Sequence, residues 1–320
     1  MRNWKRLISP VATGVVIVLF AMYAINNRNS LSGLLEISWA TLVFVGIGRM
    51  LIFFSNGMFV KWTAEAFTRR LSVGEGIYVG FLSALGNFFG PLLGGTGIRA
   101  VYLRRIHNLP YTKFTSTLMI YYVIFFMVNF TLALGGLMTL NLQETPYFLI
   151  GLLTVGILAL LSSVFIRLPR RMQSDNPEGS TIVRKVVRYI VDIESGWRLM
   201  LTMPPLLVRL VALAALSVVA QLLIAYVAFE SIGADISWGS LAVYVSIVAV
   251  SLLVAFTPGA VGIREAMLLL VSETLGVTDS EIIQVAVIDR GVTFVLLLLL
   301  FLLTRHSRLR RKLTSHDLQV

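Results

Sequence analysis

The sequence contains no cysteine and only three histidines, His107, His306 and His316, among its 320 residues. The absence of cysteine excludes a disulfide framework and thiolate chemistry, and the wide spacing of the histidines excludes a zinc cluster. Charged residues make up 13% of the chain, about half the share of an average soluble domain. No phosphate-binding loop and no Ser/His/Asp order stands out. The sequence therefore offers no catalytic residues, no metal ligands and no cofactor site.

Apolar residues dominate what is present, at 57% of the chain with a mean hydropathy of +0.84. In lipid, only helices and closed barrels satisfy their backbone groups, and long apolar runs favour helices over ten-residue alternating strands. We therefore expect an all-α polytopic membrane protein with a single membrane domain over residues 1–320. Runs long enough to cross a membrane fall at roughly 9–25, 37–60, 114–137, 146–166, 205–229 and 282–303.

Two further apolar stretches, 76–98 and 240–257, are interrupted by proline and glycine. If both dip into the membrane and return, most of the 27 basic residues fall in cytoplasmic segments. The positive-inside rule thus favours six full spans plus two oppositely oriented re-entrant hairpins, with both termini on the cytoplasmic side of the cell membrane. We attribute the net charge of +11 to contact with anionic inner-leaflet lipids rather than nucleic acid, since no aromatic–basic binding motif is present.

The two interrupted stretches resemble each other. Ser72-Val-Gly, a small-residue turn and Gly97-Ile-Arg-Ala recur as Ser237-Trp-Gly, a similar turn and Gly262-Ile-Arg-Glu, and Tyr121-Tyr122 aligns with Asp289-Arg290. With the topology above, this similarity predicts an inverted repeat, on which many carriers are built. The expected organisation is a first half at about 37–137 with hairpin 76–107, an amphipathic cytoplasmic segment at 167–200, a second half at about 205–303 with hairpin 240–276, and a basic cytoplasmic tail at 304–320.

Proline and glycine define the expected hairpin tips. Proline removes an amide donor and clashes with the preceding turn, and glycine permits turns and close backbone approach. Irregular backbone at membrane depth is tolerated where it is buried in protein or lines a wet cavity. We therefore expect a cavity at the tips, where the hairpin-breaking residues are Pro91, Gly94, Gly97, Pro258, Gly259 and Gly262.

Arg99 and Arg264 occupy the first turns of the returning half-helices, which are expected to begin near Ile98 and Ile263. Helix N-termini attract anions, and an intramembrane arginine normally faces the interior with a partner. A phosphate or carboxylate fits this position. Glu265 could pair with Arg264 or Arg290, and Asp289 with Arg99, although these pairs could equally be structural. The candidate substrate-binding residues are Arg49, Asn87, Arg99, Arg264, Glu265, Asp289 and Arg290, whereas Tyr121, Tyr122 and Tyr244 are assigned to packing.

The second half resembles a known family through the stretch from Phe256 to Ala266, Leu275-Gly276-Val277 and Ala286-Val-Ile-Asp289-Arg290. These residues are similar to the transmembrane, flippase-type domain of bacterial lysylphosphatidylglycerol synthases. The resemblance implies handling of a lipid headgroup, and identifies a stand-alone member without the soluble synthase domain. The first half departs from the family, because the acid expected before its arginine is missing and Ile120-Tyr121-Tyr122 replaces a Glu-Arg pair.

Three functions from different classes follow. The leading hypothesis is a lipid translocase that moves an anionic phospholipid or lipid-linked phosphate held at the hairpin tips. The alternatives are a membrane-embedded transferase acting on a lipid headgroup, and a non-transporting scaffold for envelope lipid enzymes. The scarcity of catalytic residues favours a transporter over an enzyme. A homodimer is left open.

Overall fold

The computed structural model describes the central part of the chain, namely residues 37–67, 70–89, 94–140, 181–252 and 258–305 with short helical pieces between 153 and 161. Within these ranges every regular element is a helix. The expected span at 9–25, most of the span at 146–166, Pro91 and nearly all of the basic tail lie outside the described residues. The predicted all-α polytopic membrane fold is confirmed, and the total of six spans stays a prediction.

Among the described residues, four helices are long and apolar enough to cross a membrane: α3 (Trp39–Glu65), α6 (Tyr111–Thr139), α9 (Pro204–Ser231) and α13 (Asp279–Arg305). They contain 27, 29, 28 and 27 residues, so each is about 40 Å long at 1.5 Å per residue. They coincide with four of the runs expected from hydropathy. Their apolar residues face both the protein core and the outside, as in a helix surrounded by lipid.

Shorter helices lie between the long ones and form two hairpins. In the first half these are α4 (Val73–Phe89) and α5 (Gly94–His107), which follow α3 and precede α6. In the second half, α10 (Trp238–Ser251) is followed by α11 (Ile263–Leu269) and α12 (Ser272–Leu275), between α9 and α13. Both halves therefore place short α-helices between two long ones, with two short helices described in the first half and three in the second.

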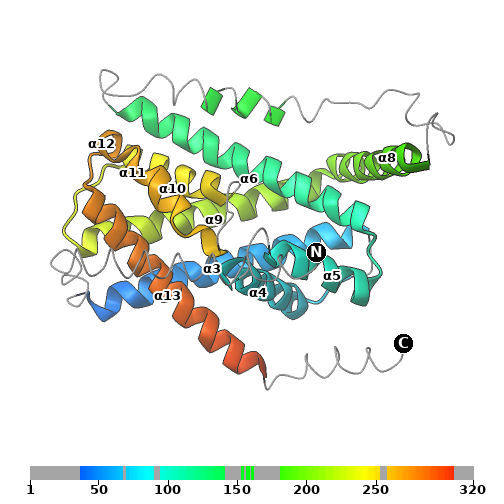
Figure 1. Cartoon of the computed structure of the whole chain (residues 1–320), viewed down its shortest axis with the longest axis horizontal. Coiled ribbons are helices and arrows are strands. Elements are labelled where there is room, and N and C mark those ends of the chain that lie inside the picture. The colour runs from blue at the N-terminus through cyan, green and yellow to red at the C-terminus, as the bar shows by residue number, and fades with distance from the viewer. Residues whose placement is uncertain are drawn as a thin grey trace, which may run out of the picture.

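Corresponding helices of the two halves run in opposite directions. Along the long axis of the molecule, α3 runs against α9 and α6 runs against α13 (Figure 1). The hairpin α4–α5 comes from one end of the bundle and the hairpin of α10 and α11 from the other, and their tips meet near the middle (Figure 1). At this meeting point, the turn containing Gly259 lies against the backbone of Phe88 at the end of α4. The re-entrant position of these hairpins in a membrane stays a prediction.

The two tips differ in backbone geometry. Gly259 and Gly262 have φ angles of 60° and 83°, the left-handed region that glycine adopts without a steric penalty. Gly94 and Gly97 instead lie inside α5, which begins at Gly94 rather than near Ile98 as expected. Gly95 explains the earlier start, since its amide donates to the Asn87 side chain at 2.9 Å and stabilises the first turn.

The amphipathic helix α8 (Thr181–Leu201) precedes α9. Its last turns are buried in the protein, where Trp197 and Met200 pack with Ile120 of α6 and Leu210 of α9. Upstream, Val186, Tyr189 and Ile190 are exposed. The expected amphipathic helix is present, and its final part is docked on α6 and α9 instead of lying free at a surface.

Glycines allow α3 and α4 to pack with their backbones in contact. A Cβ atom added to Gly80 of α4 would lie 2.7 Å from the Cα atom of Gly57 on α3, and one added to Gly76 would lie 2.9 Å from the Gly57 carbonyl oxygen. Gly76 and Gly80 are one turn apart, the small-xxx-small spacing that permits close helix packing in membranes. This contact fastens the first hairpin to α3.

We expect Gly80→Ala to lower stability, because the new methyl group overlaps the α3 backbone and overpacking costs about 1–3 kcal/mol. Gly74→Ala on the same helix is the matched control, since an added Cβ there meets nothing within 4 Å. The thermal unfolding midpoint in detergent, followed by intrinsic tryptophan fluorescence, measures both. Equal midpoints for the two variants would contradict the close α3–α4 contact.

Candidate functional site

A cavity of about 260 Å³ lies where the two hairpin tips meet. Its wall comes from both hairpins and from the long helices α3, α6 and α13. The apolar residues of the wall include Phe53, Phe88, Phe125, Phe126 and Leu252. Its polar residues are Arg49, Asn56, Ser83, Asn87, Thr96, Arg99, Tyr121, Tyr122, Arg264, Asp289, Arg290 and Thr293.

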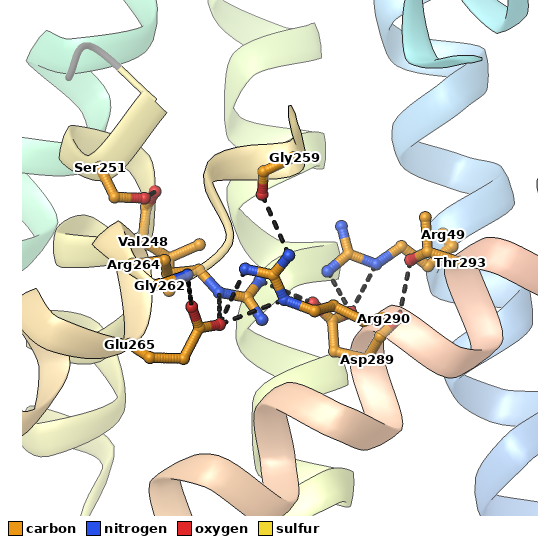
Figure 2. Close-up of polar contacts among 10 residues, drawn as sticks. All are labelled: Arg49, Val248, Ser251, Gly259, Gly262, Arg264, Glu265, Asp289, Arg290 and Thr293. Atoms are coloured by element: carbon orange, nitrogen blue, oxygen red, sulfur yellow. Dashed lines mark hydrogen bonds and ion pairs between the residues drawn. The ribbon is translucent and has the colours of Figure 1, made fainter. Parts of the chain in front are cut away.

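Asp289 of α13 is the carboxylate at the centre of the charged wall, and it is 5% exposed. One of its oxygens accepts hydrogen bonds from Arg49 of α3, with the Nε–Oδ1 distance at 2.7 Å. The other oxygen accepts from Nη1 of Arg264 at 3.0 Å. Figure 2 shows the two guanidinium groups on either side of this carboxylate. Asp289 thereby joins α3, α11 and α13 through buried, charge-assisted hydrogen bonds, which are stronger than neutral ones.

Glu265 forms a second junction beside it. Its Oε1 accepts from Nε of Arg264 at 3.3 Å and from Nη2 of Arg290 at 2.8 Å, while Oε2 accepts from the Gly262 amide at 2.8 Å (Figure 2). Arg290 also donates to the carbonyl oxygen of Gly259 at 3.2 Å. The carboxylate thus contacts both arginines expected for it. It also caps the start of α11 and ties the second hairpin tip to α13.

Arg99 lies on the opposite side of the cavity, on α5, and is 9% exposed. Its Nη2 donates to the hydroxyl of Ser83 on α4 at 2.7 Å, and its Nε has no hydrogen-bond partner in the described part of the chain. The expected pair between Arg99 and Asp289 is wrong, because Arg49 and Arg264 already occupy both Asp289 oxygens. Among the described residues, Arg99 forms no ion pair with a carboxylate.

Asn87 lines the same cavity, but its Oδ1 accepts from the Gly95 amide and so connects α4 to α5. All expected substrate-binding residues line the cavity except Glu265, which contacts two arginines that do. The expected hairpin-breaking residues occupy different places. Gly259 lines the cavity, and Gly262 supplies the amide that donates to Glu265. Gly94 and Gly97 belong to α5, and Pro258 begins the turn that contains Gly259.

Apart from Asn87, sequence reasoning missed the neutral polar residues of the wall: Asn56, Ser83, Thr96, Tyr121, Tyr122 and Thr293. The Tyr121 hydroxyl donates to Oδ1 of Asn56 at 2.9 Å, which links α6 to α3. The alignment of Tyr121-Tyr122 with Asp289-Arg290 was the available signal, since the second pair was already a site candidate. Tyr244, by contrast, packs edge-on against Phe229 in the core, as assigned.

The charges of the cavity do not balance. Four arginines, Arg49, Arg99, Arg264 and Arg290, line it, and the only acidic groups touching them in the described residues are Asp289 and Glu265. An excess of two positive charges in a partly enclosed space attracts anions, since burial weakens screening by water.

In the described ranges, no group of three or more His, Cys, Asp or Glu residues could hold a metal ion.

We expect Asp289→Asn to destabilise the protein, because Arg49 and Arg264 would both lose their buried counter-charge. Removing one partner of a buried ion pair costs about 3–5 kcal/mol. Asp235→Asn makes the same chemical change at an exposed loop position and serves as the control. Thermal unfolding of both variants in detergent measures the difference, and an Asp289→Asn midpoint equal to the wild type would show that this junction does not stabilise the fold.

Comparison with known proteins places the chain in a family. Residues 6–300 match the family described as "Lysylphosphatidylglycerol synthase TM region", and no curated protein matches the chain. The match spans both hairpins, α3, α6, α9, all but the last turn of α13, and every residue of the charged cavity. Together with the apolar helices, it identifies a multi-pass membrane protein and points to a function related to membrane lipids. The chain belongs to the family of lysylphosphatidylglycerol synthase transmembrane regions.

Proposed function

We propose that the protein is a lipid translocase, which binds an anionic lipid headgroup between its two hairpins and moves it across the cytoplasmic membrane. One observation carries the proposal. Arg99 from the first hairpin and Arg264 from the second line the same cavity, and Arg99 has no carboxylate partner in the described residues. A buried arginine without a counter-ion is costly in a membrane, so a bound anion would stabilise it.

The composition of the wall favours an amphipathic anion over a soluble one. The cavity wall contains both arginine and phenylalanine side chains. At about 260 Å³, the cavity is slightly smaller than typical sites for small molecules, which measure about 300–1,000 Å³. A headgroup would fill it, while acyl or polyprenyl chains would lie outside the cavity among apolar helices.

The arrangement of the hairpins supports movement rather than binding alone. Their tips meet at the cavity from opposite ends of the bundle (Figure 1). In carriers built from inverted repeats, a central site at the interface of the repeats is exposed to each side in turn. We further propose that both hairpins are re-entrant and that both chain termini are cytoplasmic, as the distribution of basic residues predicts. The arms α5 and α10 have 14 residues each, fewer than the roughly 20 needed to span a bilayer.

Arg99→Gln tests this function directly. In vesicles containing the protein, a tail-labelled anionic lipid should become accessible to an external quencher, and the variant should reduce that rate at least about tenfold. Folding should be retained, because Arg99 forms no ion pair with a described residue and glutamine keeps an amide that can donate to the Ser83 hydroxyl. Arg209→Gln is the matched control, since Arg209 lies on α9 over the ring of Trp62, away from the cavity.

The assay should include several anionic lipids, among them lipid monophosphates and phosphatidylglycerol. Lipid movement that is equal with wild-type protein and with protein-free vesicles, across that panel, would contradict the translocase. A rate of lipid movement that is the same in Arg99→Gln as in the wild type would instead show that Arg99 does not bind the lipid.

A further inference from the structure

The hairpin arginines of the two halves, Arg99 and Arg264, have different bonding partners. Arg264 of the second half is followed by Glu265 and faces Asp289, and it bonds to both. At the aligned positions of the first half, Arg99 is followed by Ala100, and Tyr121 stands where the second half has Asp289. The second half therefore neutralises its own arginine, whereas the first half leaves one buried guanidinium uncompensated.

Each half contributes to the cavity wall an arginine that has an unused hydrogen-bond donor. Nε of Arg99 and Nη2 of Arg264 are buried and have no hydrogen-bond partner in the described part of the chain. Thr96 and Tyr122 also line the cavity, and neither hydroxyl forms a hydrogen bond with a described residue. Several unused donors in one cavity wall favour a ligand that carries several acceptor oxygens on one atom.

Acceptors, in contrast, are already engaged. Both oxygens of Asp289 accept from arginines, and both oxygens of Glu265 accept from arginines or from the Gly262 amide. No carboxylate in the described cavity wall is left to bind an ammonium group. A headgroup that carries a lysyl or other amine would bring a positive charge into a site that already has an excess of two.

We propose that this site selects lipids that end in a phosphate monoester, and discriminates against lipids with aminoacylated headgroups. This inference rests on the proposed function and names its substrate class. A phosphate monoester carries a charge of about −1.5 to −2 at pH 7 and three terminal oxygens, which match the excess of two positive charges and the unused donors. A phosphodiester, with one negative charge and two free oxygens, would balance only one of the two excess positive charges and would accept from fewer donors.

The proposed selectivity should depend on pH, because the charge of the lipid phosphate changes with pH. The charged and titratable residues that line the cavity are Arg49 from α3, Arg99 from α5, Tyr121 and Tyr122 from α6, Arg264 from α11, and Asp289 and Arg290 from α13. Glu265 bonds to Arg264 and Arg290. No histidine is among the described lining residues. A lipid phosphate monoester loses its second proton near pH 6. Its advantage over a diester should therefore grow between pH 5 and pH 8.

The test compares three lipids with identical acyl chains on the purified full chain in detergent micelles: phosphatidate, its methyl diester phosphatidylmethanol, and lysylphosphatidylglycerol. Titration calorimetry at pH 7.5 should show phosphatidate binding at least about tenfold more tightly than the diester, because charge-assisted bonds to a second negative charge are added. At pH 5 the two should agree within about threefold. The lysyl lipid should bind most weakly at both pH values.

Asn87→Asp provides a matched variant. Its carboxylate can still accept from the Gly95 amide, but it adds a negative charge to the cavity. The preference for phosphatidate at pH 7.5 should then fall to within about threefold. Asn108→Asp makes the same change at an exposed position outside the cavity and should keep the wild-type preference. If Asn87→Asp fails to fold, the wild-type pH series decides the question alone.

The outcomes separate the two proposals. Equal affinities for phosphatidate and the diester at pH 7.5, or tighter binding of the lysyl lipid, overturn the monoester selectivity while leaving an anionic or lipid site intact. Absence of binding by all three lipids overturns the proposed function together with it. Inorganic phosphate should displace phosphatidate only weakly. If it binds as tightly as phosphatidate, the phosphate site stands and the lipid assignment fails.

Discussion

The carboxylate of Asp289, held between Arg49 and Arg264, fixes the centre of this protein. Burying any one of these three charges alone would cost several kcal/mol, and together they satisfy each other only when three helices are correctly positioned. Glu265 extends the network to Arg290 and to the turn at Gly259. The geometry of the second hairpin tip therefore depends on an electrostatic junction as much as on apolar packing.

The first hairpin is stabilised by different means. Its arms are held together by glycine contacts and by the bond from the Gly95 amide to Asn87, and its arginine is bound by a serine hydroxyl instead of a carboxylate. One half of the chain thus contains an ionic network, and the other contains a buried arginine without a carboxylate partner among the described residues. Under the proposed function, this difference divides structural support from ligand binding within a single cavity.

Hydropathy and spacing were enough to predict the long helices, because a run such as 205–229 has few alternatives in a membrane. The aligned Gly-Ile-Arg segments were likewise enough to single out Arg99 and Arg264, which both line the cavity. A charged residue in an apolar stretch is easy to recognise. The pairing of Asp289 was predicted wrongly. Which arginine a carboxylate reaches depends on how α3, α11 and α13 pack, and Arg49 is 240 residues away in sequence. Ser83 and Thr96 were missed because uncharged polar residues are unremarkable in a helix.

The glycine contacts on the long helices have a mechanical consequence. Gly57 of α3 touches the backbone of α4, whereas Gly136 of α6 approaches the backbone of Gly239 at the start of α10. Each hairpin is therefore clamped to a different long helix. Sliding of a hairpin along the long helix that holds it would disrupt closely fitted backbones. Any movement of one hairpin relative to the other must therefore carry its long helix along, and must also break or displace the ion pairs of Asp289 with Arg49 and Arg264.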